Sequence, residues 1–244
     1  MNMPEVSIIV PSLNEADNLP SLIEELNLVC IENNLDVEVI ISDDASGDNT
    51  LNVAMSLQPQ YPDLNIRVLH RYEPRRGYGA VVRYGLAHTT GRFAAIVAAD
   101  GQNPIHLLPE MLNHARNGAQ LVQCSRYSRP GDDEQVPSKS KIYQAIYRLL
   151  ACVLLGHRFP DSTYGFKLFD RVLVMALGTT SNRFSLSPEV LFKVYLSRGR
   201  IVFVPGRQRI RQQGESKFVL HREIIGHIYV LFRAWLHRIG FLWF

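Results

Sequence analysis

One apolar run ends in a single carboxylate, and it decides the fold: FAAIVAADGQNP, residues 93–104. Seven apolar residues lead into Asp100, and Gly, Asn and Pro follow closely, which is typical of a buried strand that opens into a tight loop. Ligands bind at the carboxyl ends of strands in open parallel sheets, so we expect Asp100 at a binding edge. Asp100 and Gln102 offer two oxygen ligands suited to Mg²⁺ or Mn²⁺. The alternative is that Asp100 only caps the helix that begins at Pro104.

Strands and helices alternate around this run. The sequence predicts strands at residues 6–11, 37–42, 64–70 and 120–125, and helices at residues 18–32, 50–57, 80–88 and 104–117. Acidic residues again follow the second strand. This alternation predicts one α/β domain through about residue 127, with a mostly parallel sheet and helices on both faces.

The second half of the chain is less regular. The polar segment 128–140 lacks apolar periodicity, which favours a mobile loop able to cover a site. A helix at residues 141–155 is too short to span a bilayer, so it belongs to a core or an interface. A loop at 161–169 enters a strand, and a helix at 187–197, a strand at 201–204 and a basic loop at 206–217 follow.

The tail, residues 222–244, mixes aliphatic and aromatic residues with Arg233 and Arg238. Two arginines would each cost roughly 2.5–3.5 kcal/mol at a bilayer centre, so we do not expect a membrane span. An amphipathic helix of this composition suits the plane of a membrane interface. The alternative is a helix packed on its own domain or on a second subunit.

Composition narrows the class of protein. The chain has 244 residues, 46% of them hydrophobic, and three well-separated cysteines, which favour reduced thiols in a cytosolic compartment and no thiolate metal site. No signal peptide is expected at the amino terminus. Residues 1–66 carry 12 acidic and no Lys or Arg residues, whereas residues 67–244 carry 26 basic and 11 acidic ones. This division favours a phosphate-bearing partner such as a nucleotide, nucleic acid or anionic lipid.

The first strand-to-helix turn argues against some cofactors. It reads PSLNE (residues 11–15) where a dinucleotide fold needs Gly-x-Gly-x-x-Gly, and GYG at 77–79 has only two glycines, so we do not expect nicotinamide, flavin or Walker-type phosphate binding. Acidic residues at strand ends and later basic residues instead suit a nucleotide-sugar donor. The acidic set is Glu15, Asp43, Asp44 and Asp100, and the basic set is Arg126, Arg211 and Lys217.

Successive motifs carry a resemblance. PSLNE (11–15), DDASGDNT (43–50), RGYGA (76–80) and AADGQNP (98–104) resemble family-2 inverting glycosyltransferases with the GT-A fold. SRY (125–127), DSTYGFKLF (161–169) and RQQGESK (211–217) are similar to the dolichol-phosphate mannosyltransferases and related polyprenyl-phosphate glycosyltransferases. The motifs occur in order over about residues 4–220, which is why the resemblance is specific.

The resemblance implies a GT-A catalytic domain at residues 1–220, with a nucleotide part at about 1–127 and an acceptor part at about 128–220, followed by the amphipathic segment 221–244. It implies that Asp100 and Gln102 bind Mg²⁺ or Mn²⁺, and that Asp100, Arg126, Arg211 and Lys217 serve catalysis. The donor-binding residues would be Pro11, Leu13, Glu15, Asp43, Asp44, Gly77, Gly79, Asp100, Gln102, Arg211 and Lys217. The acceptor-binding residues would be Ser125, Arg126, Lys139 and Lys141.

Three positions depart from the family pattern. Ala98 stands where the family usually has the first Asp of Asp-x-Asp, which removes one carboxylate from the donor and metal site. Leu13 replaces a common aromatic residue, and Ala45 replaces a usual glycine. These departures leave open a catalytically degenerate relative that acts as a membrane scaffold.

The resemblance implies transfer of a hexose, mannose or glucose, from GDP-mannose or UDP-glucose to a dolichyl or undecaprenyl phosphate. The protein would act on the cytoplasmic face of a membrane as a peripheral protein, and a homo-oligomer is possible. A phosphate acceptor is anionic near neutral pH and needs no strong base, whereas a hydroxyl acceptor would, with Glu189 as the candidate by chain order. A nucleic-acid-binding module is a rival that accounts for the basic residues but leaves the acidic set without a purpose.

Overall fold

The computed structural model describes residues 3–73, 77–211, 213–214 and 219–244. Its strands are β1 (Val6–Ser12), β2 (Val37–Asp43), β3 (Ile66–His70), β4 (Phe93–Ile96), β5 (Leu121–Ser125), β6 (Lys167–Asp170) and β7 (Ile201–Pro205). Its α-helices are α1 (Leu19–Glu32), α2 (Thr50–Leu57), α3 (Tyr78–Ala87), α4 (Leu108–Arg116), α5 (Ser138–Leu155), α6 (Arg171–Leu177), α7 (Leu186–Leu196) and α8 (Leu220–Arg238). The expected alternation of strands and helices is confirmed.

The strands form one sheet in the order β3-β2-β1-β4-β6-β5-β7. Parallel pairs join β3, β2, β1 and β4, and β5 pairs parallel with β7, while β6 runs antiparallel between β4 and β5. The sheet is therefore mostly parallel, as predicted. Because β1, β2 and β4 are parallel, their carboxyl ends lie at one edge, where the acidic loops follow.

Side chains of the central strands alternate between two cores. In β4, Phe93 and Ala95 face one core, whereas Ala94 and Ile96 face the other. The first core is completed by α1, α2 and α4, and the second by α3, α6 and α7. Burial on both faces is why β4 and the residues that follow it form a continuous apolar run in the sequence.

Two boundaries next to Asp100 differ from expectation. The strand that leads to Asp100 ends at Ile96, and Asn103 Oδ1 accepts a hydrogen bond from the Ala98 N–H at 2.7 Å, which occupies that donor within the loop. The helix expected from Pro104 begins as a 3₁₀ turn, Ile105–Leu107, before α4. Pro109 at the start of α4 lacks an N–H group, so it fits the first helical turn and not a helix interior.

Helix α6 was not predicted from the sequence. Its signal lies in the sequence, since Asp170 caps it by accepting a hydrogen bond from the Leu173 N–H at 2.8 Å and Gly178 ends it in a left-handed conformation. The helix was overlooked because its seven residues offer only two turns of apolar periodicity.

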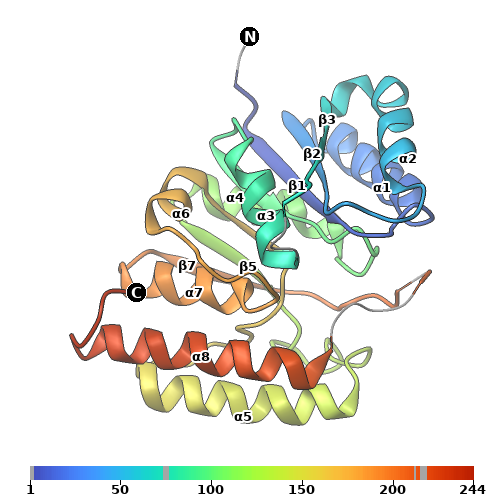
Figure 1. Cartoon of the computed structure of the whole chain (residues 1–244). Coiled ribbons are helices and arrows are strands. Elements are labelled where there is room, and N and C mark those ends of the chain that lie inside the picture. The colour runs from blue at the N-terminus through green and yellow to red at the C-terminus, as the bar shows by residue number, and fades with distance from the viewer. Residues whose placement is uncertain (1–2, 74–76, 212, 215–218) are drawn as a thin grey trace.

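Helices α5 and α8 lie side by side and form a layer outside α7 (Figure 1). Val230, Leu231 and Ala234 of α8 and Tyr147 and Ala151 of α5 are buried in the second core. The expectation that the tail forms an amphipathic helix is borne out, and its inner face packs on its own domain. Within the described part of the chain, none of the helices combines the length and apolar character needed to cross a membrane.

Candidate active site

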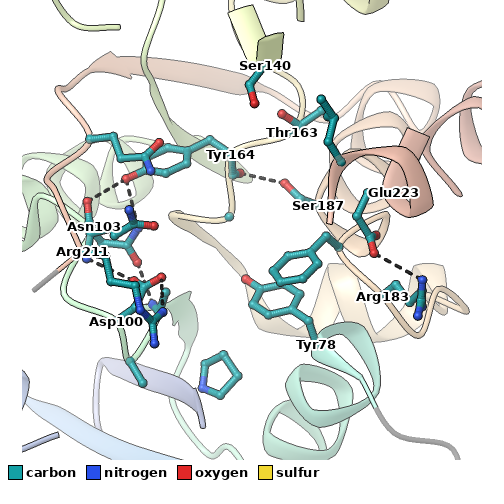
Figure 2. A pocket seen from close by; sticks show the side chains of 18 of the residues that line it. Tyr78, Asp100, Asn103, Ser140, Thr163, Tyr164, Arg183, Ser187, Arg211 and Glu223 are labelled. Atoms are coloured by element: carbon teal, nitrogen blue, oxygen red, sulfur yellow. Dashed lines mark hydrogen bonds and ion pairs between the residues drawn. The ribbon is translucent and has the colours of Figure 1, made fainter. Parts of the chain in front are cut away.

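A cavity of about 740 Å³ lies at the carboxyl ends of β1 and β4 and extends to α5 and α8. Ten of the residues singled out in the sequence line it: Pro11, Leu13, Glu15, Asp44, Gly77, Asp100, Gln102, Arg126, Lys139 and Arg211. Figure 2 shows Asp100 and Arg211 on one side of this pocket and Arg183 and Glu223 on the other. We call these the Asp100 end and the Glu223 end.

Glu15 and Arg211 form the strongest ion pair at the Asp100 end. Arg211 Nη2 lies 2.8 Å from both carboxylate oxygens of Glu15, and the Arg211 Nε donates to the Gln213 carbonyl at 2.7 Å. Asn18 Nδ2 also donates to Glu15 at 2.7 Å. The loop after β1 and the loop after β7, almost 200 residues apart in sequence, are thus joined across the pocket.

Asp100 has few partners. Its Oδ1 accepts a hydrogen bond from the Gln102 N–H at 3.1 Å, and its Oδ2 lies 3.4 Å from Arg211 Nη1. Burial raises the pKa of Asp100, while the Gln102 N–H and Arg211 act in the opposite direction. Tyr164 Oη donates to the Gln102 carbonyl at 3.2 Å and accepts from Asn103 Nδ2 at 3.1 Å, which fixes the loop.

The oxygen atoms at this end fit a divalent cation that a ligand helps to hold. Mg²⁺ is commonly bound by one or two carboxylates together with substrate phosphates, and Asp100 with Gln102 supplies such a partial set. Over the described residues, no group of three or more His, Cys, Asp or Glu side chains could hold a metal by itself. Ala98, which lines the pocket, contributes no ligand.

The two neighbouring acids after β2 have different positions. Asp44 lines the pocket and accepts hydrogen bonds from Arg71 Nη1 at 2.8 Å and from the Gly77 N–H at 2.9 Å. Asp43 is buried behind the wall, where its carboxylate lies 2.7 Å from His70 Nδ1 and accepts a hydrogen bond from the Ser46 N–H. Asp44 is therefore the better placed of the two to meet a ligand.

The glycines of the GYG motif serve the backbone. Gly77 lines the pocket with a φ of 131°, a conformation that favours glycine. Gly79 lies behind the wall, and a Cβ there would come within 2.2 Å of the Ser181 carbonyl. The Gly79 N–H donates to the Asn182 carbonyl at 2.9 Å, so this glycine permits close approach of two loops.

Arg126 is held rigidly. Its Nε donates to Asp161 Oδ2 at 2.7 Å and its Nη2 to Asp161 Oδ1 at 3.1 Å, while its Nη1 donates to Gln208 at 3.1 Å. The guanidinium also lies over the Tyr164 ring, 4.5 Å from the centroid. Burial alone would raise the pKa of Asp161, but Arg126 and nearby N–H donors hold it below its usual value.

The other residues predicted to bind the acceptor differ in whether they line the pocket. Lys139 lines the pocket, whereas Lys141 pairs with Asp133 at 3.1 Å, and Ser125 is buried with its hydroxyl accepting from Ser128 Oγ at 2.8 Å. The last part of the segment 128–140 forms pocket wall, since the buried Val136 lines it, but residues 138–140 belong to α5, which begins three residues earlier than expected. Lys217, predicted for donor binding and catalysis, lies outside the described residues.

Several wall residues were not singled out in the sequence: Tyr78, Arg183, Phe184, Ser187 and Glu223. The Tyr78 and Phe184 rings stack with centroids 4.7 Å apart and planes 13° apart. Tyr78 lies between the two glycines of the GYG motif, and this position is the sequence signal that could have identified it as a site residue. Nothing local marks Glu223, because its place in the wall depends on how α8 packs.

Glu189, the candidate base for a hydroxyl acceptor, is turned away from the pocket. Its carboxylate is buried and accepts hydrogen bonds from the Thr180 N–H at 2.8 Å, the Thr180 hydroxyl at 3.1 Å and the Ser181 N–H at 2.8 Å. These contacts hold the loop that packs on Gly79, so the geometry assigns Glu189 a structural role.

Comparison with known proteins shows the family of the chain. The family model for glycosyl transferase family 2 matches residues 7–178. A curated relative, a dolichol-phosphate mannosyltransferase of Pyrococcus furiosus, is 28% identical over 233 residues. That alignment covers 94% of this chain but 64% of the relative, so the chain spans less than two thirds of that protein's length.

Solved structures share the fold. Mannosyl-3-phosphoglycerate synthase from Rubrobacter xylanophilus matches with a TM-score of 0.71 and 21% identity over 98% of this chain and 76% of that one. Glucosyl-3-phosphoglycerate synthase from Mycobacterium tuberculosis, solved with Mn²⁺, UDP and glucosyl-3-phosphoglycerate, matches with a TM-score of 0.66 and 21% identity, covering 98% of this chain and 81% of that one. At these identities the likeness establishes the GT-A fold.

Proposed function

The chain belongs to glycosyl transferase family 2, and we propose that it transfers a hexose, with inversion, from a nucleotide-sugar donor to a polyprenyl phosphate. The observation that carries this proposal is the Asp100 end of the pocket, where a carboxylate with few partners lies beside Gln102 and the Glu15–Arg211 pair. The dolichol-phosphate mannosyltransferase relative supports the lipid phosphate as the acceptor.

We assign the nucleotide diphosphate to the Asp100 end. Carboxylates there, Glu15 and Asp44, accept hydrogen bonds and suit the hydroxyl and N–H groups of a nucleoside. Asp100 and Gln102 would hold Mg²⁺ or Mn²⁺, which when bound neutralises charge on the diphosphate. Arg211, now shared between Glu15 and Asp100, would then turn to the diphosphate oxygens.

The reaction needs positioning and charge stabilisation more than a base. An oxygen of the acceptor phosphate attacks the anomeric carbon, a bond from that oxygen to the carbon forms, and the bond from the carbon to the diphosphate oxygen breaks. The bonding electrons leave with the nucleoside diphosphate. Because a phosphate monoester has a second pKa of about 6, the attacking oxygen is already anionic near neutral pH.

Arg126 and Lys139 are the cations we assign to the acceptor phosphate. Arg126 is already paired with Asp161, so its role is to present a fixed N–H direction, whereas Lys139 supplies the less committed charge. The enclosed position of Glu189 supports a phosphate over a hydroxyl acceptor, because a hydroxyl would require a base.

We place the protein peripherally on the cytoplasmic face of a membrane, with α5 and α8 against the lipid. Both helices expose large apolar residues: Ile142, Ile146, Leu149 and Val153 on α5, and Ile225, Ile228, Tyr229 and Phe232 on α8. On α5 these residues recur at intervals of three and four, which makes one stripe. An exposed apolar helix face suits a membrane interface and would bring a lipid acceptor to the pocket.

Transfer of radiolabelled sugar tests the proposed function. Purified protein is incubated with labelled GDP-mannose or UDP-glucose, Mn²⁺ and either dolichyl or undecaprenyl phosphate in detergent. We expect label in the organic phase only when a lipid phosphate is present. Label in a water-soluble product with phosphoglycerate in place of the lipid, and none with either lipid, would overturn the proposed acceptor.

Vesicle flotation tests the membrane surface. Replacing Ile146 or Val153 on α5 by Asp should reduce binding to anionic vesicles several-fold, since a charge then faces the acyl boundary. Ile31→Asp is the matched control, because Ile31 is a comparably exposed aliphatic residue on α1. Equal flotation of all three variants and wild type would contradict the assignment.

A further inference from the structure

Glu223 at the start of α8 is a buried carboxylate that faces the pocket (Figure 2). The residue is 4% exposed. Its Oε1 lies 3.5 Å from Arg183 Nη1, a long contact, and among the described residues its buried Oε2 has no hydrogen-bond partner. A buried carboxylate oxygen without a donor is costly, so this atom is expected to be satisfied by a ligand.

The negative charge and acceptor oxygens of Glu223 determine which chemical groups of a ligand it can bind. A phosphate brought against Glu223 would meet a like charge and offer no donor when fully ionised. Hydroxyl groups are neutral and donate hydrogen bonds. Burial raises the pKa of Glu223, while Arg183 and the Phe184 N–H act in the opposite direction.

Tyr78 lies in the pocket between its two ends (Figure 2), and the ring of Phe184, also a wall residue, stacks on it. An aromatic ring in the wall suits the C–H face of a pyranose ring. Gly165 leaves room for this arrangement, since a Cβ at that position would come within 2.7 Å of Tyr78 Oη. A hexose attached to a diphosphate at the Asp100 end would extend over these rings toward Glu223.

We propose that Glu223, supported by Arg183 and beside the Tyr78–Phe184 stack, forms a hydroxyl-binding subsite for the transferred hexose, so that α8 takes part in selecting the sugar. This inference rests on the proposed function, because it concerns the sugar of that donor. It adds a sugar-recognition role to a helix whose outer face we assign to the membrane.

Calorimetric titration separates the sugar from the nucleotide. The dissociation constants of the nucleoside diphosphate and of the nucleotide sugar are measured with Mn²⁺ for wild type, Glu223→Gln and the control Glu110→Gln, an exposed carboxylate on α4. We expect Glu223→Gln to weaken nucleotide-sugar binding about tenfold, and to leave nucleoside diphosphate binding within about twofold. The control should match wild type for both ligands.

Donor analogues supply a second test of the subsite. Donor analogues that each lack one sugar hydroxyl should include one that binds about tenfold more weakly than the parent, and Glu223→Gln should no longer distinguish that analogue from the parent.

Two results would overturn the subsite. The first is an unchanged ratio of nucleotide-sugar to nucleoside diphosphate affinity in Glu223→Gln. The second is an effect confined to the KM of the acceptor, which would place the acceptor at Glu223. If wild type binds neither ligand, the proposed function itself fails, and that result is distinct because it appears before any variant is compared.

Discussion

Two carboxylates near the pocket, Asp161 and Asp100, each pair with an arginine, yet their surroundings differ. Asp161 is fully buried and accepts two hydrogen bonds from Arg126 side-chain nitrogens, at 2.7 and 3.1 Å, and one from the Thr163 N–H at 3.1 Å. The Asp100 side chain is 20% exposed and has one backbone donor at 3.1 Å and Arg211 at 3.4 Å.

This difference shows in the opposite directions of their pKa shifts. The pKa of Asp161 is lowered because its donors outweigh burial, and that of Asp100 is raised because burial outweighs its donors. Asp161 is therefore satisfied by the protein and serves to hold Arg126. Asp100 is not, and we infer that a ligand completes it; Glu223 resembles Asp100 in this respect.

Asp100→Asn should have the largest effect. It removes the charged ligand at the end of the pocket that we assign to the metal and diphosphate, so we expect the initial rate of sugar transfer with Mn²⁺ to fall about 10³-fold. Asp63→Asn, at an exposed carboxylate, should leave the rate unchanged. If the variant keeps more than about a tenth of the rate, Asp100 does not serve the metal and diphosphate as proposed.

Arg126→Gln should act mainly on stability. It leaves the Asp161 carboxylate buried without its ion partner, and such a loss costs about 3–5 kcal/mol in the free energy of unfolding, measured by urea denaturation. The double variant Arg126→Gln, Asp161→Asn should recover part of that loss, because no charge is left buried. A single variant within about 1 kcal/mol of wild type would remove the contrast with Asp100.

Lys167, whose charge interacts with both Asp161 and Arg126, provides a further test of this comparison. It is buried, and burial lowers its pKa to about 7, with Asp161 acting in the opposite direction. Between pH 7 and the ordinary lysine range the unfolded chain holds a proton that the folded chain has released, so this group makes stability rise with pH, by at most about 1.4 kcal/mol per pH unit. Lys167→Met should lack this contribution, so the difference in unfolding free energy between the proteins should change between pH 7 and 9. A constant difference would contradict the assignment.

Glu189→Gln should have the smallest effect on chemistry. The carboxylate already accepts three hydrogen bonds from residues 180 and 181, so the variant should lose about 1 kcal/mol of stability and keep transfer within about threefold of wild type. Loss of transfer with fold and donor binding intact would instead identify Glu189 as a base and favour a hydroxyl acceptor.

Much of the fold was predictable because its strands are buried on both faces. Apolar residues predominate in the strands at residues 6–12, 37–43 and 121–125, and the turn residues after them mark the binding edge. Helix α6 and the antiparallel direction of β6 were not predicted, since a short helix has weak periodicity and strand direction depends on tertiary pairing.

The site was predictable where motifs sit in the loops after strands, as with Glu15 and Asp100. Sequence could not separate Asp43 from Asp44, because adjacent residues at a strand end point to opposite sides and only the surrounding loops decide which side faces the cavity. Arg183 and Glu223 come from the loop before α7 and from α8, which reach the pocket only through helix packing.

The central claim is that Asp100 needs a ligand to complete it, and donor binding tests it most directly. Calorimetric titration of the folded protein with GDP-mannose and UDP-glucose, each with and without Mn²⁺, should show that one donor binds and that removal of Mn²⁺ weakens its binding by at least about tenfold. Binding of neither donor, or equal binding with and without the metal, would contradict the account.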